Sequence, residues 1–381
     1  MIQQQQTTSQ KGGWQSNHEE LMRQDAERYR QESLRTAIVS YPPRWATVAI
    51  GSACTNRCTF CSYHSHDARN GKSNVYNLKY KMSVERFRQH VDFFHAGRVP
   101  HVHICATGEP FLHDGIMDMI DYVAERYGKA SFQSNFNSSV MERGNYLRKI
   151  LERKDVISYI VTDLHAGDEG VFDSIKKGSS LKDLLATLRI FSSHGIRIIG
   201  SCILSRSNYK AIPKIIDVLS THRIKMQLNV VGLFPHMFNN FTAIDNVYHK
   251  ADVEITKSLE HMRRMGEKCG ITVQLPTPFD DPGGKCTVFW EKIQIWPVKG
   301  IDPARYDENL IPHACNAVVL GDINTLGYAS DFPTVMDFWN NDVLVAIRRK
   351  ILSGEQPDRF CWSCPGGMTL MRPANPNLTA P

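Results

Sequence analysis

Three cysteines stand close together in the stretch ACTNRCTFC. Cys54, Cys58 and Cys61 are separated by three and then two residues, and no fourth cysteine stands nearby. A structural zinc site needs four ligands, usually from two paired knuckles, so this triplet does not complete one. In a [4Fe–4S] cluster, three thiolates leave one iron open to another ligand. The spacing therefore favours an iron–sulfur cluster with an open position over structural zinc.

Two further motifs follow along the chain. HVHICA at 101–106 leads into TGEP, and ASFQSN at 130–135 ends in a serine and an asparagine. Together with CTNRCTFC, they resemble the CxxxCxxC and GGEP motifs of the radical S-adenosylmethionine (SAM) superfamily, over about residues 45–235. The resemblance implies a [4Fe–4S] cluster whose open iron binds SAM. It also implies reductive cleavage of SAM to a 5′-deoxyadenosyl radical, which abstracts a substrate hydrogen.

The resemblance also implies roles for single residues. The GEP motif would hold the SAM amine through its backbone and its glutamate, and Thr107 replaces the first glycine of the motif. Ser134 and Asn135 would lie near the SAM carboxylate or ribose, although they could instead cap the following helix. His64 and His66 follow the cysteine triplet, and each could be a surface residue, a supporting hydrogen-bond donor or a substrate contact. The residues expected at the SAM site are Phe60, Thr107, Gly108, Glu109, Pro110, Ser134 and Asn135.

Six strand-like runs alternate with amphipathic helical patterns and must position these motifs. The runs are 46–51, 101–106, 130–135, 156–164, 196–204 and 225–233. Such alternation predicts an α/β fold, with a parallel sheet covered by helices. The resemblance makes this a partial (β/α)6 TIM-like barrel. In such folds reactive groups lie at the C-terminal ends of the strands, and the cysteine triplet directly follows the first strand.

A second group of cysteines lies near the C-terminal end. Its members are Cys286, Cys315, Cys361 and Cys364, and the last two form the CxxC of FCWSCP. With the preceding FWNNDVLVAIRRKILSG, this pattern resembles the SPASM and twitch extensions of radical SAM enzymes. The resemblance implies an auxiliary [4Fe–4S] cluster with four thiolates, in a small domain of a β-hairpin and a helix. The chain lacks the further cysteines of the full, two-cluster SPASM pattern, which favours the twitch-like form, and about ten residues appear to be inserted before Cys315. By ligand count alone, zinc or plain buried cysteines remain alternatives.

These features divide the chain into four expected parts. They are an N-terminal extension (1–44), partly disordered with a short helix, the barrel (45–235), a helical linker (236–284) and the auxiliary-cluster domain (285–381). The N-terminal extension is too short for the recognition domain of many peptide-modifying relatives. We therefore expect a small sugar-like or cyclitol-like substrate, with a ribosomal peptide as the alternative.

The expected reaction is oxidation of a carbinol-type carbon, with the auxiliary cluster as electron acceptor. A base must remove the hydroxyl proton, and Asp163, His165 and Asp168 follow the fourth predicted strand. Cys105 and Cys202 stand on predicted strands. Either could donate a hydrogen atom in a redox-neutral epimerisation, or be a small buried apolar residue.

The composition is that of a globular protein, with 381 residues, 42% hydrophobic, and a net charge of +6. No basic stripe interleaved with aromatic residues is visible, which disfavours nucleic acid as a partner. No apolar run approaches the roughly 20 residues that span a bilayer, and no secretory signal is visible. We expect a cytoplasmic enzyme that receives electrons from a donor such as flavodoxin or ferredoxin. A non-catalytic iron–sulfur or zinc protein is disfavoured by the TGEP motif and the six-strand framework.

Overall fold

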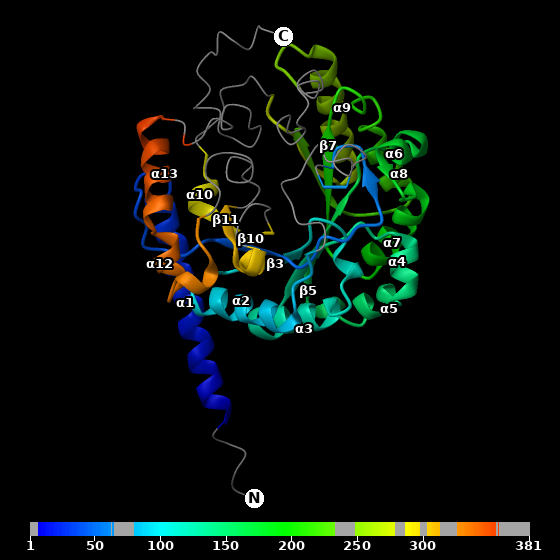
Figure 1. The fold of residues 1–381 in the computed structure, drawn as a ribbon. Helices are drawn as coiled ribbons and strands as arrows, with labels where there is room; N and C mark the ends of the chain where they lie inside the picture. Colours follow the sequence, from blue (N-terminus) through cyan, green and yellow to red (C-terminus); the bar gives the residue numbers. More distant parts are fainter. Residues whose placement is uncertain are drawn as a thin grey trace, which may run out of the picture.

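The computed structural model describes residues 7–61, 63–64, 80–232, 248–278, 286–297, 303–312, 326–355 and 357. All six predicted strands form, and they lie side by side in one sheet (Figure 1). They are β1 (Trp45–Ala49), β3 (Val102–Cys105), β4 (Ala130–Gln133), β5 (Ile157–Asp163), β7 (Ile198–Leu204) and β8 (Gln227–Gly232). Every pairing among them is parallel, which confirms the predicted α/β class.

The sheet continues beyond these six strands at both edges. Strand β9 (Thr272–Gln274) pairs in parallel with β8. At the other edge, β10 (Lys292–Ile295) pairs in parallel with β1, and β11 (Leu310–Pro312) pairs antiparallel with β10. Strand β10 belongs to the segment expected to form the auxiliary domain, and yet it extends the main sheet. The domain boundary at residue 285 stays a prediction.

Helices cover one face of the sheet and form the core with it. They are α2 (Val84–Ala96), α3 (Ile116–Tyr127), α4 (Ser138–Arg143), α5 (Tyr146–Leu151), α6 (Glu169–Ile175), α7 (Leu181–Ser193), α8 (Lys214–Thr221) and α9 (Val253–Cys269). The strands bury Val48, Ile104, Phe132, Ile160, Ile198 and Leu228 in this core. Side chains alternate along a strand, so the opposite face of the sheet carries a second, more polar set, including Asp163.

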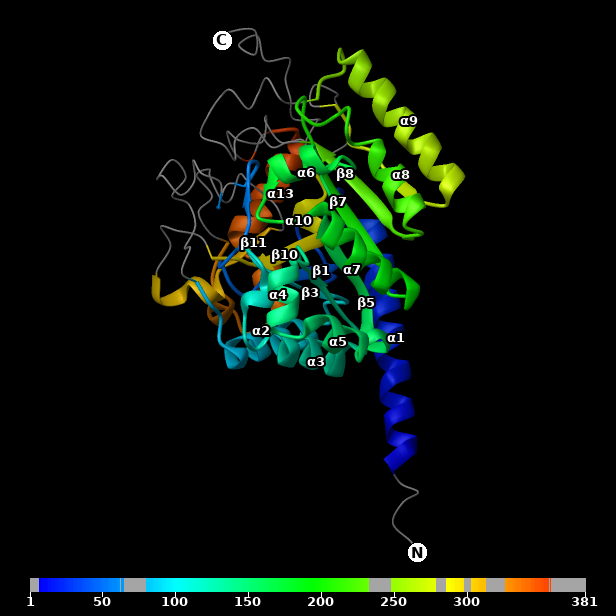
Figure 2. The ribbon, with the colours of Figure 1, turned by 90° about the vertical axis from the view of Figure 1, so that its right-hand side faces the viewer.

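The N-terminal helix and the C-terminal helices lie beside β10. Helix α1 (Thr7–Glu32) projects from the body (Figures 1 and 2). The C-terminal helices are α10 (Val288–Glu291), α12 (Val335–Trp339) and α13 (Asp342–Ser353). The buried guanidinium of Arg348 donates hydrogen bonds to the carbonyl oxygens of Ala37, Phe289 and Trp339. This one side chain therefore joins both ends of the chain. Among the described helices, none is long and apolar enough to cross a membrane.

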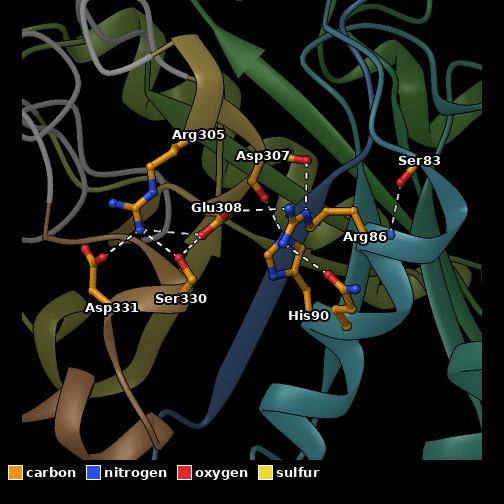
Figure 3. Close-up of polar contacts among 9 residues, drawn as sticks. Ser83, Arg86, His90, Arg305, Asp307, Glu308, Ser330 and Asp331 are labelled. Carbon is orange, nitrogen blue, oxygen red and sulfur yellow. Dashed lines mark hydrogen bonds and ion pairs between the residues drawn. The ribbon is translucent and has the colours of Figure 1, made fainter.

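A polar network joins the short helices η6 (Pro303–Glu308) and η7 (Ala329–Asp331) to α2 (Figure 3). Glu308 is only 7% exposed, and its carboxylate lies 3.4 Å from the Arg86 guanidinium and 3.6 Å from that of Arg305. Burial would raise the pKa of Glu308, but the hydrogen bond from Ser330 and the two arginines outweigh it, and the pKa is lowered. The charged carboxylate thus holds the C-terminal region against the barrel helix.

Candidate active site

The three cysteines of the triplet line one loop directly after β1, and each is half-buried. The backbone N–H of Asn56 points to the Cys54 sulfur at 3.4 Å, and the N–H of His64 points to the Cys61 sulfur at 3.2 Å. Such bonds favour thiolates, which metal binding requires. Burial raises the pKa of Cys54 and of Cys58 to about 12, so the metal-free thiols are protonated at neutral pH. Loading a cluster must therefore release protons.

In the part of the chain that the structure describes, no three His, Cys, Asp or Glu side chains gather as one metal ion would require. The preference for a [4Fe–4S] cluster over zinc therefore rests on the cysteine spacing in the sequence and stays a prediction.

The TGEP turn packs directly on the start of the cysteine loop. The N–H of Thr107 donates to the carbonyl oxygen of Gly51 at 3.0 Å, and that of Glu109 donates to Ala53 at 2.7 Å. A Cβ added to Gly108 would lie 2.1 Å from the Ala53 carbonyl oxygen, so only glycine permits this approach. The chain thereby brings the glutamate of the turn next to the thiols.

Glu109 is buried, and its neighbours orient its carboxylate. Oxygen Oε1 accepts hydrogen bonds from the Ser134 hydroxyl at 2.9 Å and the Phe111 N–H at 3.1 Å, and Oε2 accepts one from the Asn135 N–H at 2.8 Å. Burial raises the pKa of Glu109, and these hydrogen bonds oppose that rise. Ser134 and Asn135 do not cap the next helix, because Asn137 caps α4.

Two short strands hold the cysteine loop from the other side. Strand β2 (Arg57–Cys58) pairs antiparallel with β6 (Lys176–Lys177), which places Cys58 opposite Lys176. The side-chain amide of Asn137 donates to the Asn56 side-chain oxygen at 3.2 Å and also to the Gly178 carbonyl. Periodicity in the sequence gave no sign of this two-residue pairing.

Some buried polar atoms at the site have no hydrogen-bond partner within the described residues. They include the Thr107 hydroxyl and the side-chain nitrogen of Asn56. Thr107 is 6% exposed and Asn56 is 1% exposed. An unpaired buried polar group is costly, so these atoms mark places where a bound ligand or water would be stabilised. The donor set, the packed turn and these free polar atoms together fit a cluster and a polar small molecule.

His165 supports the cysteine loop and is poorly placed to act as a base. Its ring meets the Phe60 ring edge-on, with centroids 5.8 Å apart. Its Nδ1 accepts the N–H of Ile203 at 3.2 Å, which leaves that nitrogen no free lone pair. Burial lowers the pKa of His165 to about 4, so the ring is neutral. We assign it the positioning of Phe60.

The two predicted aspartates lie in different settings. Asp168 caps α6 by accepting the Val171 N–H, and it pairs with Lys214 at 3.1 Å. Those two partners lower the pKa of Asp168 and give it a structural role. Asp163 ends β5 on the polar face, in register with Ser201 of β7, which is in register with Asn229 of β8. Asp163 is therefore the better placed candidate base.

The remaining predicted cysteines also separate by position. Cys105 ends β3 on the polar face, just before the TGEP turn, and is 3% exposed. Cys202 is fully buried in the core beside the helices, which turns its thiol away from the polar face. Cys286 is buried just before α10. Cys315, Cys361, Cys364 and His66 lie outside the described residues.

The segment that forms this site matches the sequence model of a known family. Residues 48–219, which run from the end of β1 into α8, match the family model of the Radical SAM superfamily. This part of the chain is therefore similar to a radical SAM domain.

Solved structures share the fold. SuiB from Streptococcus suis bound to S-adenosylmethionine aligns with a TM-score of 0.60 and 16% identity, over 88% of this chain and 72% of SuiB. SuiB bound to its precursor peptide SuiA aligns with a TM-score of 0.58 and 15% identity, over 88% of this chain and 71% of SuiB. Native anSMEcpe with bound AdoMet aligns with a TM-score of 0.50 and 16% identity, over 77% of this chain and 80% of anSMEcpe. These likenesses confirm the partial TIM-like fold. No curated protein matches the sequence.

Proposed function

We propose that this protein is a radical SAM oxidoreductase that binds a [4Fe–4S] cluster through Cys54, Cys58 and Cys61. The observation that carries the proposal is the contact between the cysteine loop and the TGEP turn. Because Gly108 leaves no space for a side chain at that contact, the oriented Glu109 carboxylate lies near enough to the Cys54 thiol to interact with its charge. A carboxylate held in this way suits the positively charged amine of SAM.

We further propose an auxiliary [4Fe–4S] cluster at Cys286, Cys315, Cys361 and Cys364, and a donor such as flavodoxin or ferredoxin. The cluster of the cysteine loop would supply the electron that cleaves SAM. The auxiliary cluster would accept the electron that the substrate loses. The substrate is a carbinol of a sugar-like or cyclitol-like metabolite. Loss of its carbon-bound hydrogen atom, its hydroxyl proton and one electron leaves a carbonyl group.

The residues of this chain would orient the substrate and move the proton. Asp163 takes the hydroxyl proton, because it is the one predicted base that ends a strand on the polar face and is free of a capping role. Ser201 and Asn229, half-buried in the same row, suit hydroxyl groups of the substrate. Phe60, steadied by His165, covers the loop and limits the access of water.

Anaerobic reconstitution tests the cofactors. The wild type should bind about eight irons. It should also form 5′-deoxyadenosine when given SAM and dithionite, whereas a Cys58→Ala variant should form none. A Cys361→Ala/Cys364→Ala variant should keep SAM cleavage and lose about half of the iron. Four irons with one zinc would contradict the auxiliary cluster, and a wild type that makes no 5′-deoxyadenosine would contradict the proposal as a whole.

A peptide substrate is the second candidate. It is favoured by two similar structures with a bound peptide, SuiB with precursor peptide SuiA and anSMEcpe with Cp18Cys peptide, the latter with a TM-score of 0.50. A redox-neutral epimerisation would use Cys105, since Cys202 faces the core. Deuterium uptake from heavy water into the product, lost in Cys105→Ala, would identify that reaction.

A further inference from the structure

Lys176 is a fully buried cation, with 0% exposure. Its ammonium donates a hydrogen bond to the backbone carbonyl oxygen of Asp163 at 2.9 Å and lies 5.7 Å from the centre of the Phe172 ring. Among the described residues, no carboxylate forms an ion pair with it within 4.0 Å. Burying an unpaired charge costs several kcal/mol, which is comparable to the net free energy of folding. The buried carboxylate of Glu109 interacts with this charge at longer range, and a further negative group bound at the site would compensate it more completely.

The position of Lys176 indicates which negative group that is. Strand β6 pairs with β2, so Lys176 lies opposite Cys58, and the N–H of Thr59 donates to the Ile175 carbonyl at 2.8 Å. The ammonium is thus fixed behind the cysteine loop, where thiolates would concentrate negative charge.

We propose that Lys176 is a positioning residue that supplies the fixed positive charge for the cluster bound by the cysteine loop, and so raises its reduction potential. This inference rests on the cluster proposed above. Reduction adds one negative charge to a buried site, where water screens charges weakly. Net charge and nearby hydrogen bonds are the main controls of such potentials. The hydrogen bond to the Asp163 carbonyl keeps the ammonium in place.

The chain offers a matched control for this charge. Lys177 is the next residue on the same strand, but its side chain is exposed to solvent. Water screens an exposed charge, so Lys177→Met should leave the cluster unaffected although it removes the same formal charge. Lys176→Arg keeps the charge, and Lys176→Gln removes it while keeping a hydrogen-bond donor for the Asp163 carbonyl.

The experiment is a dithionite titration of the reconstituted full chain, followed by electron paramagnetic resonance. The signal that changes when SAM is added identifies the cluster of the cysteine loop. At the wild-type midpoint potential, Lys176→Met and Lys176→Gln should lower the ratio of reduced to oxidised cluster about tenfold, which corresponds to about 59 mV for one electron. Lys177→Met and Lys176→Arg should stay within about twofold of the wild type. Iron uptake by Lys176→Arg but by neither neutral variant would support the same charge requirement.

Two other results have separate meanings. Unchanged potentials in both neutral variants, with weaker SAM binding by equilibrium dialysis, would overturn the inference, because Lys176 would then act on SAM and not on the cluster. A wild type that binds iron without any SAM-dependent signal would instead overturn the proposed function.

Discussion

At the scale of single residues, the proposed site depends on the short distance between Gly108 and Ala53. The two backbone hydrogen bonds on either side of Gly108 keep the TGEP turn against the cysteine loop. No rotamer change can relieve a clash with a backbone carbonyl, because the obstacle is main chain. The thiols and the Glu109 carboxylate stay adjacent only while this contact is intact.

Gly108→Ala should therefore separate the two halves of the site. We expect a loss of unfolding free energy of about 1–3 kcal/mol from overpacking. We also expect SAM binding to fall below detection by equilibrium dialysis, because Glu109 shifts with the turn. Gly170→Ala is the control, since its added methyl group would meet only the Asp168 carboxylate at 3.5 Å. Equal SAM binding by Gly108→Ala and the wild type would contradict this account.

The sequence could predict the site residues that lie within a local motif. The Cys54 loop and the TGEP turn each follow a strand, so their closeness follows from the fold alone. The roles of His165 and Asp168 could not be predicted, because they depend on an N–H of Ile203 and an ammonium of Lys214, far away in sequence. Which face of a strand Cys202 occupies also depends on packing against helices.

At the scale of elements, the network on α2 determines where η6 and β11 lie. Arg86 of α2 and Arg305 of η6 both pair with the buried Glu308. Removing the carboxylate breaks the one link that Arg86 and Arg305 share, although each arginine keeps a second carboxylate partner. This junction should therefore be the point at which the C-terminal region separates from the barrel.

Glu308→Ala should weaken that junction by about 1.5 kcal/mol, because Arg86 keeps Asp307 and Arg305 keeps Asp331 as partners. Amide hydrogen exchange measured by mass spectrometry should become about tenfold faster or more in α2 and in 303–312, because the opening of this junction becomes easier. Glu260→Ala on α9 removes an exposed partner of Arg263 and should change exchange little. If amide exchange in α2 of Glu308→Ala stayed at the wild-type rate, the network would not be what holds the C-terminal region against α2.

The elements themselves were largely predictable, whereas their pairing was only partly so. The six strands of alternating strand–helix units appear in the expected order, since consecutive parallel strands are the common arrangement. Strand β10 lies in the segment for which the resemblance implies a β-hairpin, but its place beside β1 could not be predicted. Such a pairing joins distant parts of the chain, and neither periodicity nor spacing carries information about it.

At the scale of the whole molecule, Arg348 links both ends of the chain. Arg348→Met would remove the donor from the carbonyl groups of Ala37, Phe289 and Trp339, at about 1–3 kcal/mol for each that stays unpaired. We expect a loss of about 3 kcal/mol or more in urea unfolding. Arg349→Met changes the exposed neighbour and should have little effect. Similar midpoints for the two variants would contradict the linking role.

Buried histidines should make the stability depend on pH. Burial lowers the pKa of His90, His103 and His165 to about 4, against 6.5 for an exposed ring. The unfolded chain then binds protons that the folded chain excludes, so stability is complete above pH 6.5 and falls as the pH falls toward 4. Between pH 7 and pH 5, each histidine should cost about 2 kcal/mol.

Urea unfolding at several pH values measures this dependence. His103→Gln should reduce the slope, because one of the three excluded protons is no longer counted. His194→Gln, at an exposed position, should leave the slope as it is. An unchanged slope in His103→Gln would show that this ring is not held neutral by burial.

The pairing of β1 with β10 also affects how the chain is made. The outer edge of β1 has no partner until residues 292–295 have been synthesised, about 250 residues later. At about 5–20 residues per second, this takes roughly 12–50 s on the ribosome. An open strand edge invites pairing with other chains. A chain that stopped before β10 would carry that edge permanently, so the end of this protein protects its beginning from aggregation.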